Sequence, residues 1–339
     1  MTEKESGRLP GAFVISLDFE LHWGFFDRRE LDEGLESEMR NARLAAESML
    51  ELFREREIHA SWAAVGFLML ENREQLDRIA PANNQRPRYN DQGLDPYRVQ
   101  VGPDERSDPA HFAASLVKKI IAAPGQELAS HTFSHYYCLE PGQDEAAFAA
   151  DMRAAGAAAA LHGQAPRSIV FPRNQHNPEY GRILLEHGIG AYRGNPDHPW
   201  YRASENRIDR SLRRRAGRLL DSYINLSGKS LQSWNDLRNQ DFPLNIRASR
   251  FLRPWSSKLA PLEPLKILRI RRSIRTAAET GSIFHLWWHP HNFASHMNEN
   301  LAGLGLIFDE FDNCRERYGM CSLNMGEIAD TVKGPAAEG

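Results

Sequence analysis

The sequence lacks any apolar run long enough to cross a bilayer. No stretch approaches the roughly 20 consecutive apolar residues that a transmembrane helix requires. The first ten residues carry charges but no apolar core, so we expect no export signal. A composition of 41% hydrophobic and 26% charged residues argues against general disorder. These absences favour a soluble, globular protein.

Cysteine is also scarce. The three cysteines, Cys138, Cys314 and Cys321, show no Cys-x-x-Cys spacing and cannot form an even disulfide framework. We therefore expect reduced thiols in a cytoplasmic protein. With 339 residues, the chain is long enough to bury a large core.

The formal net charge is only −3, but it is distributed unevenly along the chain. Residues 200–280 hold 18 Lys and Arg against 7 Asp and Glu, a local balance of +11. Such a block is typical either of a solvated basic surface or of a site for an anionic partner, such as a phosphate-bearing substrate or a membrane. No nucleic-acid recognition motif accompanies the block, so we expect no nucleic-acid partner.

Part of this basic block has helical spacing. Leucines at 212, 219 and 220 lie among arginines, which predicts peripheral contact with the inner face of a membrane through residues 207–220. The arginines are Arg207, Arg210, Arg213, Arg214 and Arg218.

Strand-like and helix-like segments alternate along the rest of the chain. Apolar runs predict strands at 12–17, 58–65, 127–130, 168–171, 189–192, 283–288 and 321–323. Helical spacing or propensity predicts helices at 37–57, from 66 through 79, and at 110–123, 144–161, 178–186 and 298–318. This alternation favours a parallel sheet or an α/β barrel whose functional residues lie at the carboxyl ends of the strands.

We expect one catalytic domain over residues 1–339. Its core would comprise about 11–200 and 265–330. Residues 200–265 interrupt the alternation of strands and helices, which predicts a basic insertion or cap. Residues 82–109 are polar and rich in Pro, Asn, Asp and Gly, which predicts a long loop of the kind that is often functional.

Two acids follow the first predicted strand. Asp18 and Glu20 would project from the same face, because side chains in a strand repeat every second residue. Burying two such carboxylates costs free energy unless a cation or hydrogen-bond donors bind them. His22 would join that face if the extended conformation continued. The alternative is an ordinary strand-end acid in a helix cap or a salt bridge.

The histidines His131 and His135 follow the strand predicted at 127–130. Their i, i+4 spacing brings two imidazoles onto one face of a helix, where they can share a metal ion. Ser130 and Thr132 favour a helix start at this point. The alternative is a pair of core or surface histidines without a ligand.

Two further strand ends carry polar side chains. His289 and His291 flank a proline after the strand predicted at 283–288, and a histidine is a natural proton donor to a leaving amine. Trp287 and Trp288 offer the alternative that aromatic packing alone holds these rings. Arg173 follows the strand predicted at 168–171 and could pair with a catalytic carboxylate, keeping it ionised.

These elements, in this order, resemble the polysaccharide deacetylase family, also known as the NodB-homology fold or carbohydrate esterase family four. The matching segments are Ser16-Leu-Asp-Phe-Glu20, Ala60-Ser-Trp-Ala-Ala-Val-Gly66, Gln126-Glu-Leu-Ala-Ser-His-Thr-Phe-Ser-His135 and Leu286-Trp-Trp-His289. The resemblance covers roughly residues 11–200 and 265–330, and its most specific part is the His-x-x-x-His motif.

The resemblance implies a distorted (β/α) barrel with one divalent metal ion. By this resemblance Glu20, His131 and His135 hold the metal, Asp18 is the general base, His289 is the general acid, and Arg173 orients Asp18. Phe19 separates the two acids where the family has adjacent aspartates, so Asp18 and Glu20 could exchange roles. His291 likewise competes with His289. Zinc is the first expectation for the metal, and cobalt, nickel and iron suit the same ligands.

The implied function is hydrolysis of the N-acetyl group of an amino sugar. Without an export signal, we expect the sugar to be carried on a nucleotide or a lipid diphosphate. Two alternatives stay open: a metal-dependent amidase acting on a small cyclic amide or a formamide, and a non-catalytic glycan-binding protein on the same fold.

Overall fold

The computed structural model of the protein describes residues 9–205, 208 and 211–334. Residues 1–8, which we expected to carry no export signal, lie outside the described residues, as do Arg207 and Arg210. Within the described part of the chain, no helix is both long and apolar enough to cross a membrane. All three cysteines are free thiols, of which Cys321 is exposed.

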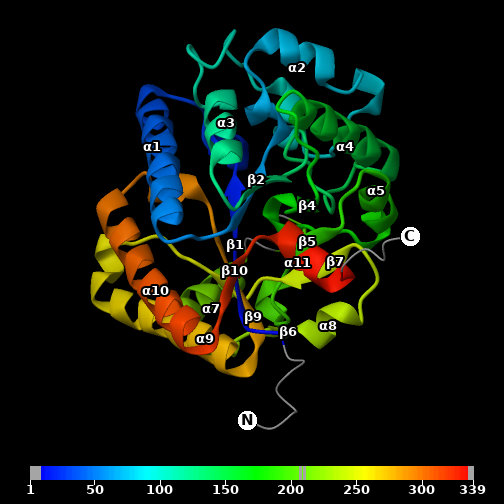
Figure 1. Ribbon diagram of the computed structural model, residues 1–339. Coiled ribbons are helices and arrows are strands. Elements are labelled where there is room, and N and C mark those ends of the chain that lie inside the picture. The colour runs from blue at the N-terminus through cyan, green and yellow to red at the C-terminus, as the bar shows by residue number, and fades with distance from the viewer. Residues whose placement is uncertain (1–8, 206–207, 209–210, 335–339) are drawn as a thin grey trace.

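In the described residues, ten strands form one sheet at the centre of the molecule (Figure 1). Its order is β6-β9-β1-β2-β3-β4-β5-β7, with β10 beside β1 and β8 beside β9. Neighbouring strands run parallel, except for β6 against β9. The strands are β1 (Ala12–Phe19), β2 (Ala60–Ala64), β3 (Gln126–Ser130), β4 (Ser168–Ile169), β5 (Ala191–Gly194), β6 (Gln232–Ser233), β7 (Leu244–Arg247), β8 (Arg250–Phe251), β9 (Ser282–Trp288) and β10 (Cys321–Leu323).

The sheet curls into a distorted, nearly closed barrel because one segment joins its two edges. Strand β7 pairs with β5, and β8, a few residues later, pairs with β9. Between them, Ala248 donates its backbone N–H to Gly194 (2.8 Å) and Ser249 donates to His285 (2.8 Å). The α/β barrel predicted from the sequence is therefore confirmed.

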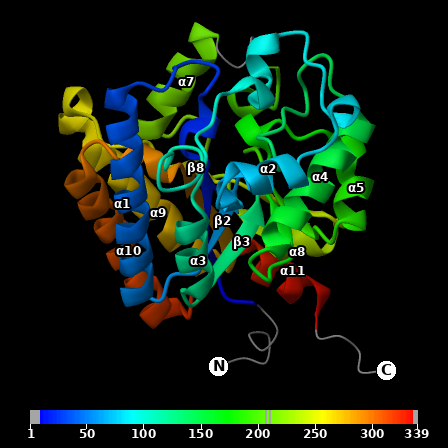
Figure 2. The same cartoon turned by 90° about the horizontal axis from the view of Figure 1, so that it is seen from above.

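Helices surround the barrel (Figure 1). Helices α1, α9 and α10 lie on one side, and α4 and α5 lie on the opposite side, as both views show (Figures 1 and 2). The helices are α1 (Glu33–Glu55), α2 (Arg73–Ile79), α3 (Ala114–Ala122), α4 (Glu145–Ala160), α5 (Gly181–Glu186), α7 (Leu212–Tyr223), α8 (Trp234–Arg238), α9 (Glu263–Thr280), α10 (Met297–Tyr318) and α11 (Met325–Lys333).

Alternation along β1 separates the core from the barrel interior. Phe13, Ile15, Leu17 and Phe19 pack in the large core under the helices. The residues between them point the other way, because successive side chains of a strand face opposite sides. Ala12 and Val14 pack in the small apolar cluster inside the barrel, followed by the buried polar side chains of Ser16 and Asp18. The barrel interior thus changes from apolar to polar toward the carboxyl end of β1.

The segment 200–265 differs from the prediction of an insertion or cap. It contributes β6, β7 and β8 to the sheet, and so forms part of the barrel wall in addition to α7. These strands are two to four residues long. Runs this short carry too little alternation to be recognised in the sequence. The predicted loop at 82–109 contains three short 3-10 turns and an isolated β-bridge from Asp104 to Asn72.

Candidate metal and catalytic site

The carboxyl end of β1 places two buried acids close together. Asp18 lies in the strand and faces the barrel interior, and Glu20 follows directly after the strand. A 3-10 turn at Leu21–Gly24 then folds back over the strand end. Gly24 lies against the Glu20 carboxylate so closely that a Cβ at this position would collide with it. The turn therefore fixes the position of Glu20.

The two histidines of the His-x-x-x-His motif lie on a loop, and the prediction of a helix start here is wrong. Thr132 and His135 have positive φ angles of 61° and 57°, which no α-helix contains. Buried Asp151 of α4 holds the loop by accepting hydrogen bonds from the backbone N–H groups of Phe133 (2.6 Å) and Ser134 (3.2 Å). The loop, and not a helical face, brings the imidazoles together.

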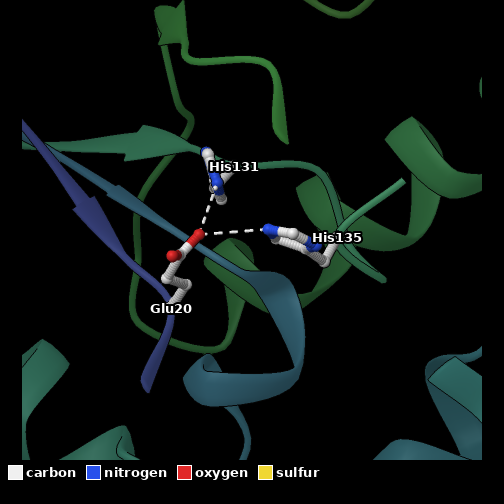
Figure 3. A group of neighbouring side chains, drawn as sticks. All are labelled: Glu20, His131 and His135. Atoms are coloured by element: carbon white, nitrogen blue, oxygen red, sulfur yellow. Dashed lines mark hydrogen bonds and ion pairs between the residues drawn. The ribbon is translucent and has the colours of Figure 1, made fainter. Parts of the chain in front are cut away.

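Glu20, His131 and His135 converge on one point (Figure 3). The Oε2 atom of Glu20 lies 3.2 Å from Nε2 of His131 and 3.0 Å from Nε2 of His135. One potential ligand atom from each residue lies within 4.8 Å of the other two. All three side chains are buried. The geometry therefore matches a buried site for one cation.

The protonation of the histidines fits a metal ligand set. Nδ1 of His131 lies 2.8 Å from the carbonyl oxygen of Val170, which can only accept, so Nδ1 carries a hydrogen and Nε2 is the atom that could bind a metal ion. Burial lowers the pKa of His135 to about 4, so this ring is neutral at pH 7. Two imidazole nitrogens and a carboxylate oxygen as close as this are stable only with a proton or a cation between them.

Glu20 itself is ionised. Burial alone would raise its pKa, but His289, His131 and His135 outweigh burial and hold the pKa well below its usual range. The donor set is thus one carboxylate and two imidazoles, the kind that binds zinc and related divalent metals.

Asp18 is held by Arg193 of β5. Nη1 and Nη2 of Arg193 lie 2.5 and 2.8 Å from the two carboxylate oxygens, an arrangement with two parallel N–H···O bonds. Arg193 also donates to Asn174 (2.9 Å) and lies over the ring of Trp287. Burial would raise the pKa of Asp18, but Arg193 and His289 outweigh it and hold the pKa below its ordinary value.

The prediction that Arg173 orients Asp18 is therefore wrong. Arg173 instead forms an ion pair with Asp27 (2.7 Å) and lies over the ring of Tyr137, whose hydroxyl is 3.1 Å from Nδ1 of His135. Its backbone has a φ angle of 53°, which turns the side chain in a direction that a regular strand end would not give.

His289 lies beside both acids. Its Nε2 atom is 3.4 Å from Oε1 of Glu20 and 3.7 Å from Oδ2 of Asp18. The ring is partly exposed and packs against Phe251 and Trp287. His291 stacks at an angle to His289 with ring centroids 5.2 Å apart, and burial lowers its pKa to about 4. Of the two histidines, His289 thus has the direct contacts with the acids.

His22 does not join the acids. The turn after Glu20 points its ring away, where Nδ1 lies 2.8 Å from Nε2 of His111 and Nε2 donates to the backbone carbonyl of Arg29 (2.8 Å). His111 in turn contacts Asp108 (2.8 Å). The extended conformation needed for His22 to face the site ends at Phe19.

Arg193, Tyr137 and Asp151 were not predicted from the sequence as site residues. Arg193 alone had a usable signal: a charged residue directly after the apolar strand predicted at 189–192, two positions from Ala191 and so on the same face. Tyr137 and Asp151 have no such signal, because their contacts depend on the path of the loop after β3.

No family model matches the sequence, and no curated protein matches it significantly. Solved structures do match. A protein from Mycobacterium smegmatis described as a polysaccharide deacetylase superposes with a TM-score of 0.56 at 13% identity, covering 96% of this chain and 91% of the other. One from Pseudomonas aeruginosa PAO1 with the same description gives 0.54 at 12% identity, with 94% and 89% covered.

A third structure, the PuuE allantoinase, has a TM-score of 0.51 at 13% identity, with 94% of this chain and 88% of that chain covered. At such identities the likeness establishes the fold alone. The chain therefore has the distorted α/β barrel of these three structures. At the carboxyl end of its first strand it has a buried triad that could hold a metal ion.

Proposed function

We propose that the protein is a metal-dependent hydrolase that removes the N-acetyl group from an amino sugar. One observation carries this proposal: the three potential ligands of a single cation lie directly beside a buried carboxylate held by arginine and a partly exposed histidine. This combination supplies a cation site, a proton acceptor and a proton donor around one point.

Glu20, His131 and His135 would hold the metal ion. Three protein ligands leave coordination positions open, as catalytic zinc sites do. When bound, a divalent ion supplies Lewis-acid polarisation of a carbonyl and makes a water molecule more acidic. Zinc is the first expectation, and cobalt, nickel and iron fit the same ligands.

The remaining residues divide the proton transfers. Asp18, ionised and fixed by Arg193, accepts the proton of the attacking water. His289 gives a proton to the nitrogen of the departing amine, so that acetate and a free amino sugar are released. Glu20 is shared by both imidazoles, which favours it as the ligand and Asp18 as the base.

We further propose that the sugar is part of a nucleotide- or lipid-linked precursor. The support for this is electrostatic: residues 200–280 carry a balance of +11, and although Arg250, Lys266 and Arg269 are buried, Arg213 and Arg215 are exposed. Exposed basic side chains attract the phosphates of a carrier.

A second candidate is hydrolysis of a small cyclic amide or a formamide. It would use the same residues, and the allantoinase with the same fold gives it support. A non-catalytic, glycan-binding role is the third candidate and predicts binding without turnover.

The experiment is a substrate panel with the metal-loaded protein. We expect acetate release from at least one acetylated nucleotide sugar or lipid-linked sugar, and none from the His131→Ala variant. Ring opening of cyclic amides without acetate release would support the second candidate. Binding of a sugar with no product from any substrate would overturn the enzymatic proposal.

A further inference from the structure

Helix α7 turns its apolar side toward solvent. Its buried positions include Gly217 and Asp221, whereas Leu212 is 80% exposed and Leu220 is 53% exposed. At about 100° per residue, one stripe of the helix is apolar and faces outward. The stripe consists of the exposed Leu212, Ala216 and Leu220 and the half-buried Leu219, and it ends before Tyr223, which is buried. This is the reverse of an ordinary surface helix, whose apolar side packs on the core.

Polar contacts on the inner side fix this orientation. The Asp221 carboxylate accepts hydrogen bonds from Arg250 (2.8 Å), Arg269 (2.9 Å) and the hydroxyl of Tyr201 (2.8 Å). Turning the helix to bury its leucines would leave two buried guanidinium groups without their carboxylate, which is strongly unfavourable. One turn earlier, Gly217 lies against the ring of Trp200, where a Cβ would not fit.

The apolar surface extends beyond α7. Of the twelve large hydrophobic side chains that are exposed in the described part of the chain, eight lie between Ile208 and Leu268. They belong to α7 and its flanks and to the start of α9, against which α7 packs. Exposed leucines and isoleucines on two helices that pack together are typical of an interaction surface. The eight are Ile208, Leu212, Leu220, Ile224, Leu226, Leu262, Leu265 and Leu268.

The charge around this surface is basic. Helix α7 contains four arginines and one acid, and that acid, Asp221, is buried between Arg250 and Arg269. Arg213 and Arg215 are exposed and lie on either side of the leucine stripe. An apolar stripe bordered by arginines matches the interfacial zone of an anionic bilayer, where leucine enters the acyl boundary and arginine meets phosphate.

We propose that α7, together with the start of α9, docks on an anionic membrane surface. The alternative of a symmetric pair of chains is disfavoured, because a two-fold contact would place the arginines of one copy against those of the other. This inference concerns the surface of α7 and does not rest on the hydrolytic chemistry.

The docking surface adjoins the end of the barrel that carries the candidate site. Arg214 of α7 donates to the backbone carbonyl of Arg202 (3.2 Å) and to Ser204 (2.8 Å), in the segment that follows β5. The carboxyl end of β5 carries Arg193, which holds Asp18. Figure 2 shows α7 at the upper edge of the molecule. A membrane on this face would therefore lie next to the mouth of the site.

Vesicle flotation tests the proposal. The full-length protein should float with vesicles of phosphatidylcholine containing phosphatidylglycerol and stay at the bottom with phosphatidylcholine alone. Two double variants should each weaken binding by roughly tenfold or more: Leu212→Ser with Leu220→Ser removes apolar area that would enter the acyl boundary, and Arg213→Glu with Arg215→Glu reverses the charge that meets the phosphates. Raising the ionic strength to about 1 M should release the wild type.

Matched controls come from the rest of the surface. Leu161→Ser with Leu185→Ser, and Arg78→Glu with Arg317→Glu, alter exposed residues away from α7 and should float like the wild type. Circular dichroism should show that all variants are folded. Equal flotation of the α7 variants and the wild type would overturn the proposal. So would absence of flotation combined with a dimer in solution that the Leu212 and Leu220 changes dissociate, since the surface would then bind a second copy.

Discussion

Arg193 and Asp18 form a two-bond ion pair across the barrel, although they are 175 positions apart in the sequence. Both side chains are buried, and the guanidinium also lies over Trp287. A carboxylate in this environment keeps its charge because Arg193, together with His289, compensates for lost hydration. The pair therefore determines the protonation state of the proposed base.

Replacing Arg193 by methionine should shift the acidic limb of the pH–activity profile to higher pH. With the arginine removed, burial raises the pKa of Asp18, so the base is protonated over a wider range. The measurement is kcat/KM against pH with the metal-loaded enzyme, which reports the free enzyme's essential groups. Activity at neutral pH should fall by roughly a hundredfold or more, on the scale of general-base catalysis.

The matched control is Arg173→Met. Arg173 contacts Asp27 and Tyr137 instead of Asp18, so its loss should leave the acidic limb in place. If both variants shifted the limb equally, the assignment of Arg193 as the partner of the base would be wrong.

Two variants should distinguish metal binding from turnover. His131→Ala removes a ligand, so metal content and activity should fall together. Asp18→Asn leaves the ligand set intact and should keep most of the metal while losing turnover. Elemental analysis after dialysis, paired with acetate release, measures both. Loss of metal in Asp18→Asn with retention in Glu20→Gln would reverse the roles of the two acids.

Gly24→Ala should weaken metal binding although it replaces none of the proposed ligands. The new Cβ would collide with the carboxylate of Glu20 and push it out of position. We expect affinity to fall roughly 10- to 100-fold, as when a residue that supports a ligand is changed, and metal titration would measure this. Gly156→Ala is the control, because a Cβ there meets nothing within 4 Å. Equal affinities in the two variants would contradict the positioning role of the turn.

The sequence was sufficient for the parts of this site that depend on local pattern. The apolar run before Asp18 and Glu20 is a buried strand, and the alternation of strands and helices does give a barrel. Arg193 was missed because its partner is set by the order of strands around the barrel, which no local pattern contains. Arg173 was misassigned because its positive φ angle cannot be read from its neighbours.

The loop after β3 shows a second reason why part of the site could not be predicted from the sequence. An i, i+4 pair of histidines fits a helix and fits this loop equally well, since both can bring the two rings together. Asp151, 16 positions beyond His135, decides between them by accepting the loop's backbone N–H groups. Its contribution becomes visible only when α4 is placed beside the loop.

A last prediction concerns acid stability. His285 is fully buried in the barrel, with Nε2 2.8 Å from Oγ of Ser16. Burial and the nearby Arg193 lower its pKa to about 3. Because the unfolded chain titrates near the ordinary histidine value of about 6.5, it binds the proton more readily than the folded chain between these two values. The free energy of unfolding should therefore be at its full value above about pH 6.5 and fall as pH decreases toward 3.

Replacing His285 by glutamine keeps a polar side chain but removes the titration, so the loss of stability between pH 6.5 and 4 should become smaller. Urea unfolding of the metal-free protein at several pH values measures the slope.

His59→Gln is the opposing control. A hydrogen bond to Glu327, against partial burial, raises the pKa of His59, so its contribution is present at low pH and disappears as pH rises. The His59 variant should lose stability on the acidic side, and an unchanged slope in His285→Gln would show that this buried ring does not control the acid transition.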